Sequence, residues 1–537
     1  MRVFRSVLLK QPPLTWCYPV RSRAMIGLVA VLAMTGCGGG GGAPGTTTDA
    51  TSSLSDAGAA ALDPARLQRT TTTAVSVTMP MTCTRASPLP VRPAQYLSVT
   101  DFGARPDDDN DDASAIIAAL EAAKPGQWVV FPPGRYIQSK SISVNKVGVT
   151  LWGQGATLHA TNPADQAILL RADDTKVYGF TLTAVTEARR SEPWNTRICA
   201  NGYDTAKGYI RGVVIQGNSV VAADRDPGGP LSNGASAAGI AVVGVRDFTI
   251  ANNFVERTLA DGIHVTGGSQ NGRVIDNKVK ETGDDMIAVV SYLDKAWRTK
   301  AKDSSTWFST VGSSSMVKDI YIARNEVSGQ YWGRGIAVVG GSGITVRENT
   351  VSKTATGAGI LVARERSYET HGVSNVLVEN NNVTLVQTTA PAYVPSGSFF
   401  STYSDRYKVN QGRSGQAGIE IHNTSSLTDI QDPVLSPKVQ VADVLVSNNV
   451  VSDVVRDAIR VGADSNQGSI SGVVLVKNKL QAAINSPIMG TSADGSFSIF
   501  QCSENSYDGK SYGVANCIAP KYPMNVTGAI LACGVLY

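Results

Sequence analysis

The chain has 537 residues, of which 53 are glycine, 7% are aromatic and 17% are charged. This composition suits a turn-rich β protein, and a formal net charge of only +4 gives no reason to expect a nucleic-acid partner. Removing the five basic residues of segment 1–36 from that charge leaves −1 for the rest of the chain.

The N-terminal segment has the pattern of an export signal. Arg21 and Arg23 precede an apolar run at 26–34 that is too short to span a bilayer. Small residues then lead to Cys37 and five glycines, an arrangement that resembles the signal of a bacterial lipoprotein. The resemblance implies that residues 1–36 are removed and that a lipid on Cys37 anchors the protein in the outer membrane, facing the periplasm or the surface. A secretory signal without a lipid is the alternative, and both predict export.

Residues 37–93 are rich in Gly, Thr, Ser and Ala and show no periodicity, which predicts a flexible tether. Five cysteines follow Cys37, and pairs are expected in an exported protein. Their separation in sequence favours a bridge between Cys502 and Cys517. The Cys and His residues show no metal-binding spacing, so no zinc site is expected.

The segment 96–138 predicts a strand, an acidic loop, a helix and a second strand. The helix is expected over 112–124, because Asp112 is a favourable N-cap and Pro125 with Gly126 ends the pattern. An amphipathic helix in this place suits a cap over the open end of a solenoid, whose first coil would otherwise expose an unpaired edge.

From about residue 213 to 480 the sequence repeats an apolar strand that ends in Asn-x-Val. Successive copies lie 24 or 48 residues apart in the regular part, which predicts a β-solenoid with coils of about 24 residues. Equivalent residues of such coils stack about 4.8 Å apart, so the asparagines should form a column that satisfies backbone and amide groups at one corner. The predicted column is Asn218, Asn253, Asn277, Asn325, Asn349, Asn381, Asn448 and Asn478.

Each coil also carries a strand of the form Gly-Ile-x-Val, whose Ile and Val should point into the core. The position before this motif holds Asp261, Asp285 and Arg334 in successive coils, with Asp284 beside Asp285 and His264 on the outward face of the first strand. One such Asp is an ordinary turn residue. Carboxylates stacked in adjacent coils repel one another and shift their pKa values, so the group predicts a functional site.

Two sets of motifs resemble known families. The V-x-DFGA phrase at 99–104, the acidic loop, the helix and the PPG-x-Y strand at 132–136 resemble the pectate-lyase-like, right-handed parallel β-helix superfamily, over about 96–490. The resemblance implies an all-β fold, with a parallel β-helix over 94–495 and a Cys-containing C-terminal cap over 496–537.

The phrases ADGIHV at 260–265 and GDDMIAV at 283–289 resemble polygalacturonase-type glycoside hydrolases. Carried across, Asp284 would be the general acid, while Asp261 and Asp285 would hold and activate water in an inverting reaction. The chain departs from that family at Arg334, where the family has the His of a Gly-His-Gly. The Arg-x-Lys substrate clamp of the family would fall at Leu361 and Ala363, which cannot bind a carboxylate.

Three other functions fit the same residues. A lyase or epimerase acting on a uronate polymer would use the three Asp residues to hold Ca²⁺ and Arg334 or His264 as the base; a hydrolase would need no cofactor. A glycan-binding adhesin or a structural surface protein would not turn substrate over. We expect a monomer that binds a polysaccharide through charged groups on the same face and aromatic residues in inserted loops: His264, Arg334, Arg364, Glu420, His422, Arg460, Trp297 and Trp307.

Overall fold

The computed structural model describes seven stretches of the chain: 85–184, 193–221, 238–293, 316–388, 416–463, 470–492 and 498–512. The proposed signal peptide, most of the tether, Cys37, Cys517, Trp297 and Trp307 lie outside them. Within these stretches, none of the helices has both the length and the apolar character needed to cross a membrane.

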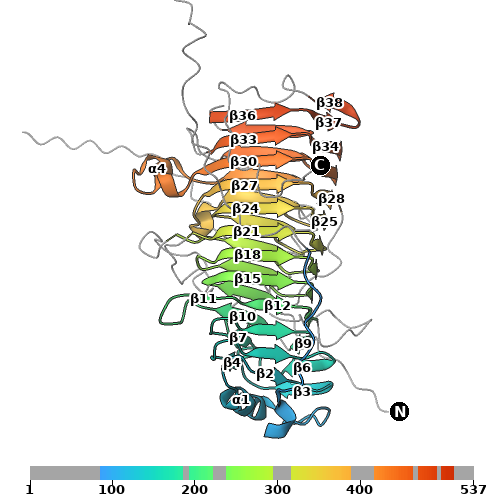
Figure 1. Cartoon of the computed structure of the whole chain (residues 1–537). Helices are drawn as coiled ribbons and strands as arrows, with labels where there is room; N and C mark the ends of the chain where they lie inside the picture. Colours follow the sequence, from blue (N-terminus) through green and yellow to red (C-terminus); the bar gives the residue numbers. More distant parts are fainter. Residues whose placement is uncertain are drawn as a thin grey trace, which may run out of the picture. The chain divides into compact units, whose positions relative to one another are not determined.

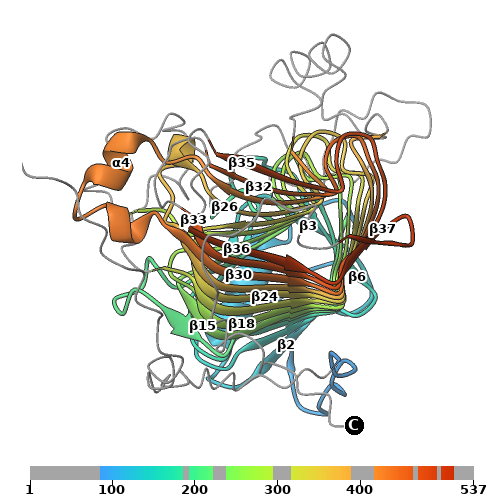
Figure 2. The same cartoon turned by 90° about the horizontal axis from the view of Figure 1, so that it is seen from above.

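The described residues form the parallel β-helix that the sequence predicts (Figure 1). Each full coil contributes one strand to each of three long sheets, which enclose the core when viewed along the stack (Figure 2). Successive coils pair in parallel in all three sheets. We call the sheets A, B and C.

Sheet A runs the length of the stack, and its strands are β1 (Leu97–Ser98), β2 (Trp128–Val130), β5 (Thr150–Trp152), β8 (Lys176–Tyr178), β12 (Val214–Gln216), β15 (Val245–Ala251), β18 (Gln270–Ile275), β21 (Lys318–Ala323), β24 (Gly341–Arg347), β27 (Val373–Glu379), β30 (Val441–Ser447), β33 (Ile470–Val476) and β36 (Ser498–Ser503), with β11 (Ile210–Arg211) beside β15. Sheet B contains β3 (Gly134–Gln138), β6 (Ala156–Ala160), β9 (Thr181–Ala184), β13 (Ser219–Val220), β16 (Phe254–Glu256), β19 (Lys278–Lys280), β22 (Glu326–Ser328), β25 (Thr350–Ser352), β28 (Asn382–Val386), β31 (Val450–Val454), β34 (Lys479–Ala483), β37 (Asn505–Tyr507) and β38 (Lys510–Tyr512). Sheet C contains β4 (Ile142–Val144), β7 (Ile168–Leu170), β10 (Ile198–Asn201), β14 (Ile240–Val243), β17 (Ile263–Thr266), β20 (Ile287–Val290), β23 (Ile336–Val339), β26 (Ile360–Arg364), β29 (Ile419–Asn423), β32 (Ile459–Ala463) and β35 (Ile488–Ser492).

The Gly-Ile-x-Val motifs form sheet C in the predicted register. Ile263 pairs with Ile240 on one side and Ile287 on the other, and all three side chains are fully buried in the core. The intervening residue faces outward, so that His264 lies between Ala241 and Ala288 on the outer face. The apolar columns thus fix the register, because a slip of one residue would turn each buried Ile to the outside.

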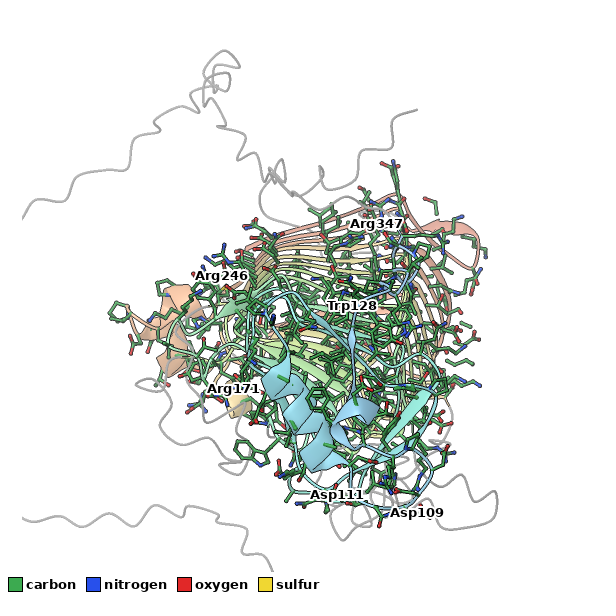
Figure 3. The ribbon with its side chains drawn as sticks, turned by 60° about the horizontal axis from the view of Figure 1, so that its bottom comes forward. Asp109, Asp111, Trp128, Arg171, Arg246 and Arg347 are labelled. Atoms are coloured by element: carbon green, nitrogen blue, oxygen red, sulfur yellow. The ribbon has the colours of Figure 1, made fainter. Side chains whose placement is uncertain are left out.

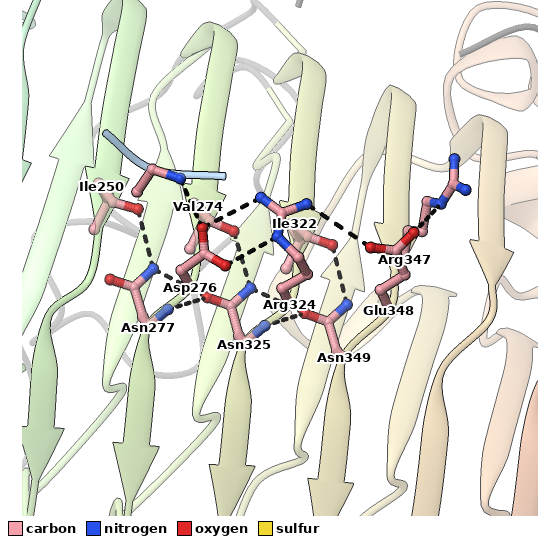
Figure 4. Close-up of polar contacts among 11 residues, drawn as sticks. Ile250, Val274, Asp276, Asn277, Ile322, Arg324, Asn325, Arg347, Glu348 and Asn349 are labelled. Carbon is pink, nitrogen blue, oxygen red and sulfur yellow. Dashed lines mark hydrogen bonds and ion pairs between the residues drawn. The ribbon is translucent and has the colours of Figure 1, made fainter. Parts of the chain in front are cut away.

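The asparagine column exists and is continuous (Figure 4). The backbone N–H of Asn277 donates to Oδ1 of Asn325 at 3.0 Å, and that of Asn325 donates to Oδ1 of Asn349 at 2.9 Å. Each side-chain amide donates both to the next asparagine and to a carbonyl of the coil before, for example Asn325 Nδ2 to Val274 O at 2.9 Å. The column therefore satisfies buried polar groups at the corner between sheets A and B.

One member of the predicted column was wrong, and another was missed. Asn381 bonds to Asn449, not to the predicted Asn448. Asn448 is exposed and has a φ of 55°, and so supplies the left-handed turn that precedes the column residue. Asn505 extends the column by one coil beyond Asn478.

A short helix closes the first coil, as predicted. Helix α1 (Ala113–Ala122) follows Asp112 and packs Ile116 and Leu120 into the core. The N-cap expectation was wrong in detail: the Asp112 carboxylate accepts from the backbone N–H groups of Arg105 and Ile137, at 2.7 and 2.9 Å. Asp111, labelled in Figure 3 with Asp109 near this helix, accepts from the first helical N–H instead.

The other helical turns in the described stretches are η2 (Val99–Phe102), η4 (Arg366–Tyr368), α4 (Leu427–Gln431) and η5 (Ser436–Lys438). Parallel coils continue to β37, beyond the predicted boundary at residue 495, and β38 then turns back antiparallel to β37. Cys502 is disulfide-bonded, with a partner outside the described residues, while Cys199 is free and buried.

The described chain begins with a strap, residues 85–96, that crosses several coils on the outer face of sheet A (Figure 1). The N–H of Ala86 donates to the Asp276 carboxylate at 2.9 Å, next to β18. Ser87 O accepts from the Gln216 side chain, and Leu89 packs with Trp152 and Tyr178 nearer the cap. The strap therefore ties the middle of the stack to its first coils.

Candidate active site

Adjacent turns into sheet C bring the three predicted aspartates together. Asp261 lies two residues before β17, and Asp285 holds the same position before β20 in the next coil. Gly262 N donates to Asp285 O at 3.0 Å. The backbone N–H of Asp285 also donates to Asp261 Oδ1 at 3.1 Å. One carboxylate oxygen from each of Asp261, Asp284 and Asp285 lies within 4.8 Å of the others. The spacing of one coil thus produces the cluster expected from the sequence.

Asp285 is the buried member of the trio, with only 6% of its surface exposed. Burial raises the pKa of its carboxyl to about 7, since desolvation disfavours the charged form. The Arg334 guanidinium opposes this shift, while the carboxylates of Asp284 and Asp261 add to it. The cluster therefore retains a proton in part of its population near neutral pH.

Asp261 is oriented by His264. Nδ1 of His264 lies 2.5 Å from Asp261 Oδ2, and the imidazole is almost fully buried on the outer face of β17. With its other oxygen held by the Asp285 N–H, the Asp261 carboxylate is fixed in position from two sides. The structure thus places His264 in the pocket, in contact with an acid, and its role in binding substrate stays a prediction.

Arg334 comes from the next coil and lies among carboxylates. Its backbone N–H donates to Asp285 Oδ1 at 2.7 Å, and its guanidinium lies 3.5 Å from the same oxygen and pairs with Glu365. Desolvation acts to lower the pKa of Arg334, but the charges of Asp285 and Asp284 outweigh it and raise the pKa. A guanidinium held in this way is poorly suited to act as a base.

The Gly333 backbone passes directly against the acids. A Cβ atom at this position would overlap the Asp284 and Asp285 carboxylates, so the close approach requires glycine. The fully buried Gln330 side chain holds this segment, because its amide donates to Gly333 O and its carbonyl accepts from Ala355 N at 2.6 Å.

These groups open into one pocket. Its walls come from the ends of β20 and β23 and from the segment after β26, and the lining residues are Asp261, His264, Asp284, Asp285, Val290, Tyr292, Arg334, Val339, Glu365, Tyr368 and Thr370. A backbone bridge between Tyr292 and Thr370 joins two of these segments. Glu365 and Thr370 were not predicted, because they lie outside the repeating columns.

Arg364 was predicted to bind substrate, but its side chain does not reach this pocket. It is 2% exposed and its guanidinium lies 3.2 Å from the Asp429 carboxylate. Its burial lowers the pKa to about 10, against the opposing charge of Asp429. Arg364 therefore holds α4 against β26.

Glu420, His422 and Arg460 form a separate cluster on sheet C. His422 Nδ1 and the Arg460 guanidinium lie 3.1 and 3.7 Å from Glu420 Oε1. Strand β29 is three pairings away from β20, which places Glu420 roughly 14 Å along the stack. The structure thus divides the predicted substrate-binding residues among three places: the pocket, the contact with Asp429 and the Glu420 cluster. Trp297 and Trp307 lie outside the described residues.

Comparison with known proteins identifies the family. Residues 96–385 match the family described as rhamnogalacturonase A/epimerase, pectate lyase-like, and the chain belongs to this family. This assignment agrees with the three parallel sheets. No curated protein shows significant sequence similarity over the chain.

Several solved structures are similar at low sequence identity. The catalytic unit of an α-1,3-glucanase from Streptomyces thermodiastaticus is 19% identical with a TM-score of 0.49, covering 78% of this chain, which spans 65% of that protein. A family 28 exopolygalacturonase from Yersinia enterocolitica is 14% identical with a TM-score of 0.43, covering 78% and 79% of the two chains. The A-module of a mannuronan C-5 epimerase from Azotobacter vinelandii is 14% identical with a TM-score of 0.37, covering 80% and 100%. At these scores they do not bear on the activity of this protein.

Proposed function

We propose that this protein is a glycoside hydrolase that cleaves a polysaccharide by carboxylate acid/base catalysis in the pocket on sheet C. The observation that carries the proposal is the cluster of Asp261, Asp284 and Asp285, with an oxygen from each within 4.8 Å of the others at the wall of an open pocket. Glycoside hydrolysis needs one carboxyl that donates a proton and one carboxylate that activates water or attacks.

The environments of the three groups support this division of labour. Burial keeps a proton on Asp285 in part of the population near neutral pH, so the cluster is able to hold an acid and a base at the same time. Asp261 is fixed by His264 and by the Asp285 N–H, as a group that positions water needs to be. Because the charge of Asp284 adds to the raised pKa of Asp285, we infer that the two neighbouring carboxyls share the retained proton. Asp284 is the less buried of the two and lines the pocket, and we assign it the transfer of that shared proton to the leaving oxygen.

In the test, the full-length protein is incubated with a panel of acidic and neutral polysaccharides, and two kinds of reaction product are measured. New reducing ends measure hydrolysis, and the ultraviolet absorbance of an unsaturated sugar measures elimination. We expect reducing ends without absorbance, unchanged by a chelator and lost in Asp284→Asn. Asp429→Asn, which alters an acid outside the pocket, is the matched control and should retain activity. Absence of both products on the whole panel would contradict the proposal.

A lyase or epimerase is the second candidate, because three hard oxygen donors within 4.8 Å of one another suit the ligand preference of Ca²⁺. Asp261, Asp284 and Asp285 would hold the ion, which would neutralise the carboxylate of a uronate. Two of these carboxylates already accept backbone N–H groups, and Asp285 also lies beside Arg334. Absorbance that disappears with chelator would establish a calcium-dependent lyase instead.

We also propose that Cys37 anchors the protein to the outer membrane, from the residues that surround it. The test compares the wild type with Cys37→Ser in fractionated cells. The wild type should be found with membranes and incorporate a labelled fatty acid, and the variant should not incorporate the label. Wild-type protein in the soluble fraction would instead support a secretory signal that is cleaved without attachment of a lipid.

A further inference from the structure

We propose that the sugar unit bound at the aspartate cluster carries no carboxylate, so that the protein acts on neutral or amino-sugar glycans and rejects uronates. This inference rests on the proposed function and adds the class of substrate. It is carried by the charge of the pocket and by the way in which each nearby cation is already engaged.

The charge of the pocket is strongly negative. The described lining residues contain four carboxylates, those of Asp261, Asp284, Asp285 and Glu365, against a single guanidinium, that of Arg334. The formal charge of these lining residues is −3 when His264 is counted as neutral. Protonation of one carboxyl would leave it at −2. A uronate carboxylate would enter this field as a further like charge.

Arg334 is not available to offset that charge. Its guanidinium pairs with Glu365 and lies 3.5 Å from Asp285, and its side chain is only 15% exposed. A uronate would have to displace one of these partners and leave a buried carboxylate uncompensated, which costs more than the new contact gains.

Other described cations on this face also pair with carboxylates of the protein, although Arg366 is 55% exposed. Arg364 and Arg366 both approach Asp429, at 3.2 and 3.0 Å. His422 and Arg460 lie against Glu420, three coils from β20. Among the described residues of this face, these cations therefore form pairs within the protein. Neutral hydroxyls, by contrast, donate readily to carboxylates, and a sugar ammonium group would be attracted to them.

The test measures cleavage and binding with the full-length protein, since segment 294–315 adds further basic residues outside the described ones. The substrates are polygalacturonate, neutral glucans and galactans, and chitosan as an amino-sugar polymer. We expect a kcat/KM on polygalacturonate that is lower by on the order of 100-fold than that on the best substrate without carboxylates. Binding of a short oligogalacturonate should strengthen with added salt, because salt screens repulsion.

Glu365→Gln sharpens the test. It removes one carboxylate and releases one side of Arg334, so oligogalacturonate should bind about tenfold more tightly. Asp429→Asn is the matched control, because it releases Arg364 and Arg366 from an acid outside the pocket and should leave this binding unchanged.

The outcomes separate the inference from the proposed function. Rapid cleavage of polygalacturonate that is lost in Asp284→Asn would overturn the inference and support the hydrolase. Cleavage of a neutral or amino-sugar glycan alone supports both. If nothing in the panel is cleaved, the proposed function fails. Binding then decides the inference, and oligogalacturonate that binds more tightly than the neutral oligomers, with affinity weakened by salt, overturns it.

Discussion

Two columns of polar residues run along the same solenoid and behave in opposite ways. At the corner between sheets A and B, asparagines repeat from Asn218 to Asn505, and each one donates to the next. At the entry to sheet C, acids stack in adjacent coils only at Asp261 and Asp285 among the described residues, while Asp457 stands alone in a later coil. Burial raises the pKa of Asp285 and of Asp457. An amide is both donor and acceptor and stacks on its own kind at a gain, whereas a carboxylate stacked on another repels it.

This contrast indicates where a repeat protein retains chemically reactive groups. A column that satisfies itself is able to extend through every coil, because each added residue completes the hydrogen bonds of the one before. A column of like charges costs stability with every added coil, so it persists where the charge is used. Substitutions in the two columns should therefore differ in whether they reduce activity or stability.

Asp284→Asn should give the largest change and leave the fold intact. Removing a general acid is expected to lower kcat by about 10²–10⁴-fold, while the thermal unfolding midpoint changes little because Asp284 is not deeply buried. Initial rates and a melting curve on the same preparation measure both. If Asp284→Asn lowered the thermal unfolding midpoint substantially as well as kcat, the acid column would have a structural role.

Asn449→Ala should reverse that pattern. The side chain of Asn449 accepts two hydrogen bonds from Asn381 and donates to Val378 O and to Asn478. Its loss leaves several buried groups unsatisfied and should lower the free energy of unfolding by about 3 kcal/mol.

Denaturant unfolding measures the effect of Asn449→Ala, with kcat on the best substrate expected to be unchanged. The control is Asn448→Gly, which preserves the positive φ of the exposed neighbour and should change stability by less than about 1 kcal/mol. If Asn449→Ala and Asn448→Gly changed the free energy of unfolding equally, Asn449 would not be the residue that forms the column.

The pH dependence of the free energy of unfolding should reveal the buried acid of the charged column. Because the pKa of Asp285 is about 7 in the folded protein and 3.8 in the unfolded chain, the folded state binds more protons between these values, and stability falls as the pH rises through this window. The expected loss is roughly 2 kcal/mol between pH 5 and 7. Asp285→Asn should abolish this part of the slope, as seen in unfolding midpoints at a series of pH values. An unchanged slope in the variant would assign it to other groups.

Glu326→Gln should have the smallest effect. Glu326 pairs with Lys278 in the neighbouring coil of sheet B at 2.8 Å, but both side chains are about half exposed. Solvent screens such pairs, so the free energy of unfolding should change by less than about 0.5 kcal/mol. A change as large as that of Asn449→Ala would mean that exposed charge stacking stabilises the coils as strongly as the amide column.

The repeating parts of the fold were predictable because stacking makes each column visible in sequence. The register of sheet C and the meeting of Asp261 with Asp285 both follow from a spacing of one coil. The error at Asn448 arose where two asparagines adjoin: the buried valine of that coil is Val451, two residues after Asn449. Asn505 was missed because Tyr507 replaces the valine that marks the other copies.

The parts that repeat only once could not be predicted in this way. Glu365 reaches Arg334 from a turn after β26, and Arg364 is drawn away from the pocket by Asp429 on α4. Both outcomes depend on which of several nearby carboxylates an arginine meets in three dimensions. No periodicity in the sequence specifies that choice.

The strap at 85–96 has a mechanical consequence. A pull on the chain ahead of Arg85 would first reach the contact between Ala86 and Asp276 in the middle of the stack, then those of Ser87 and Leu89 nearer the cap. The force would thus act along several coils of sheet A at once before it reached the first coil. Force applied at the first coil alone would separate its strands one at a time. A protein tethered by its N-terminus would in this way resist unravelling from its own point of attachment.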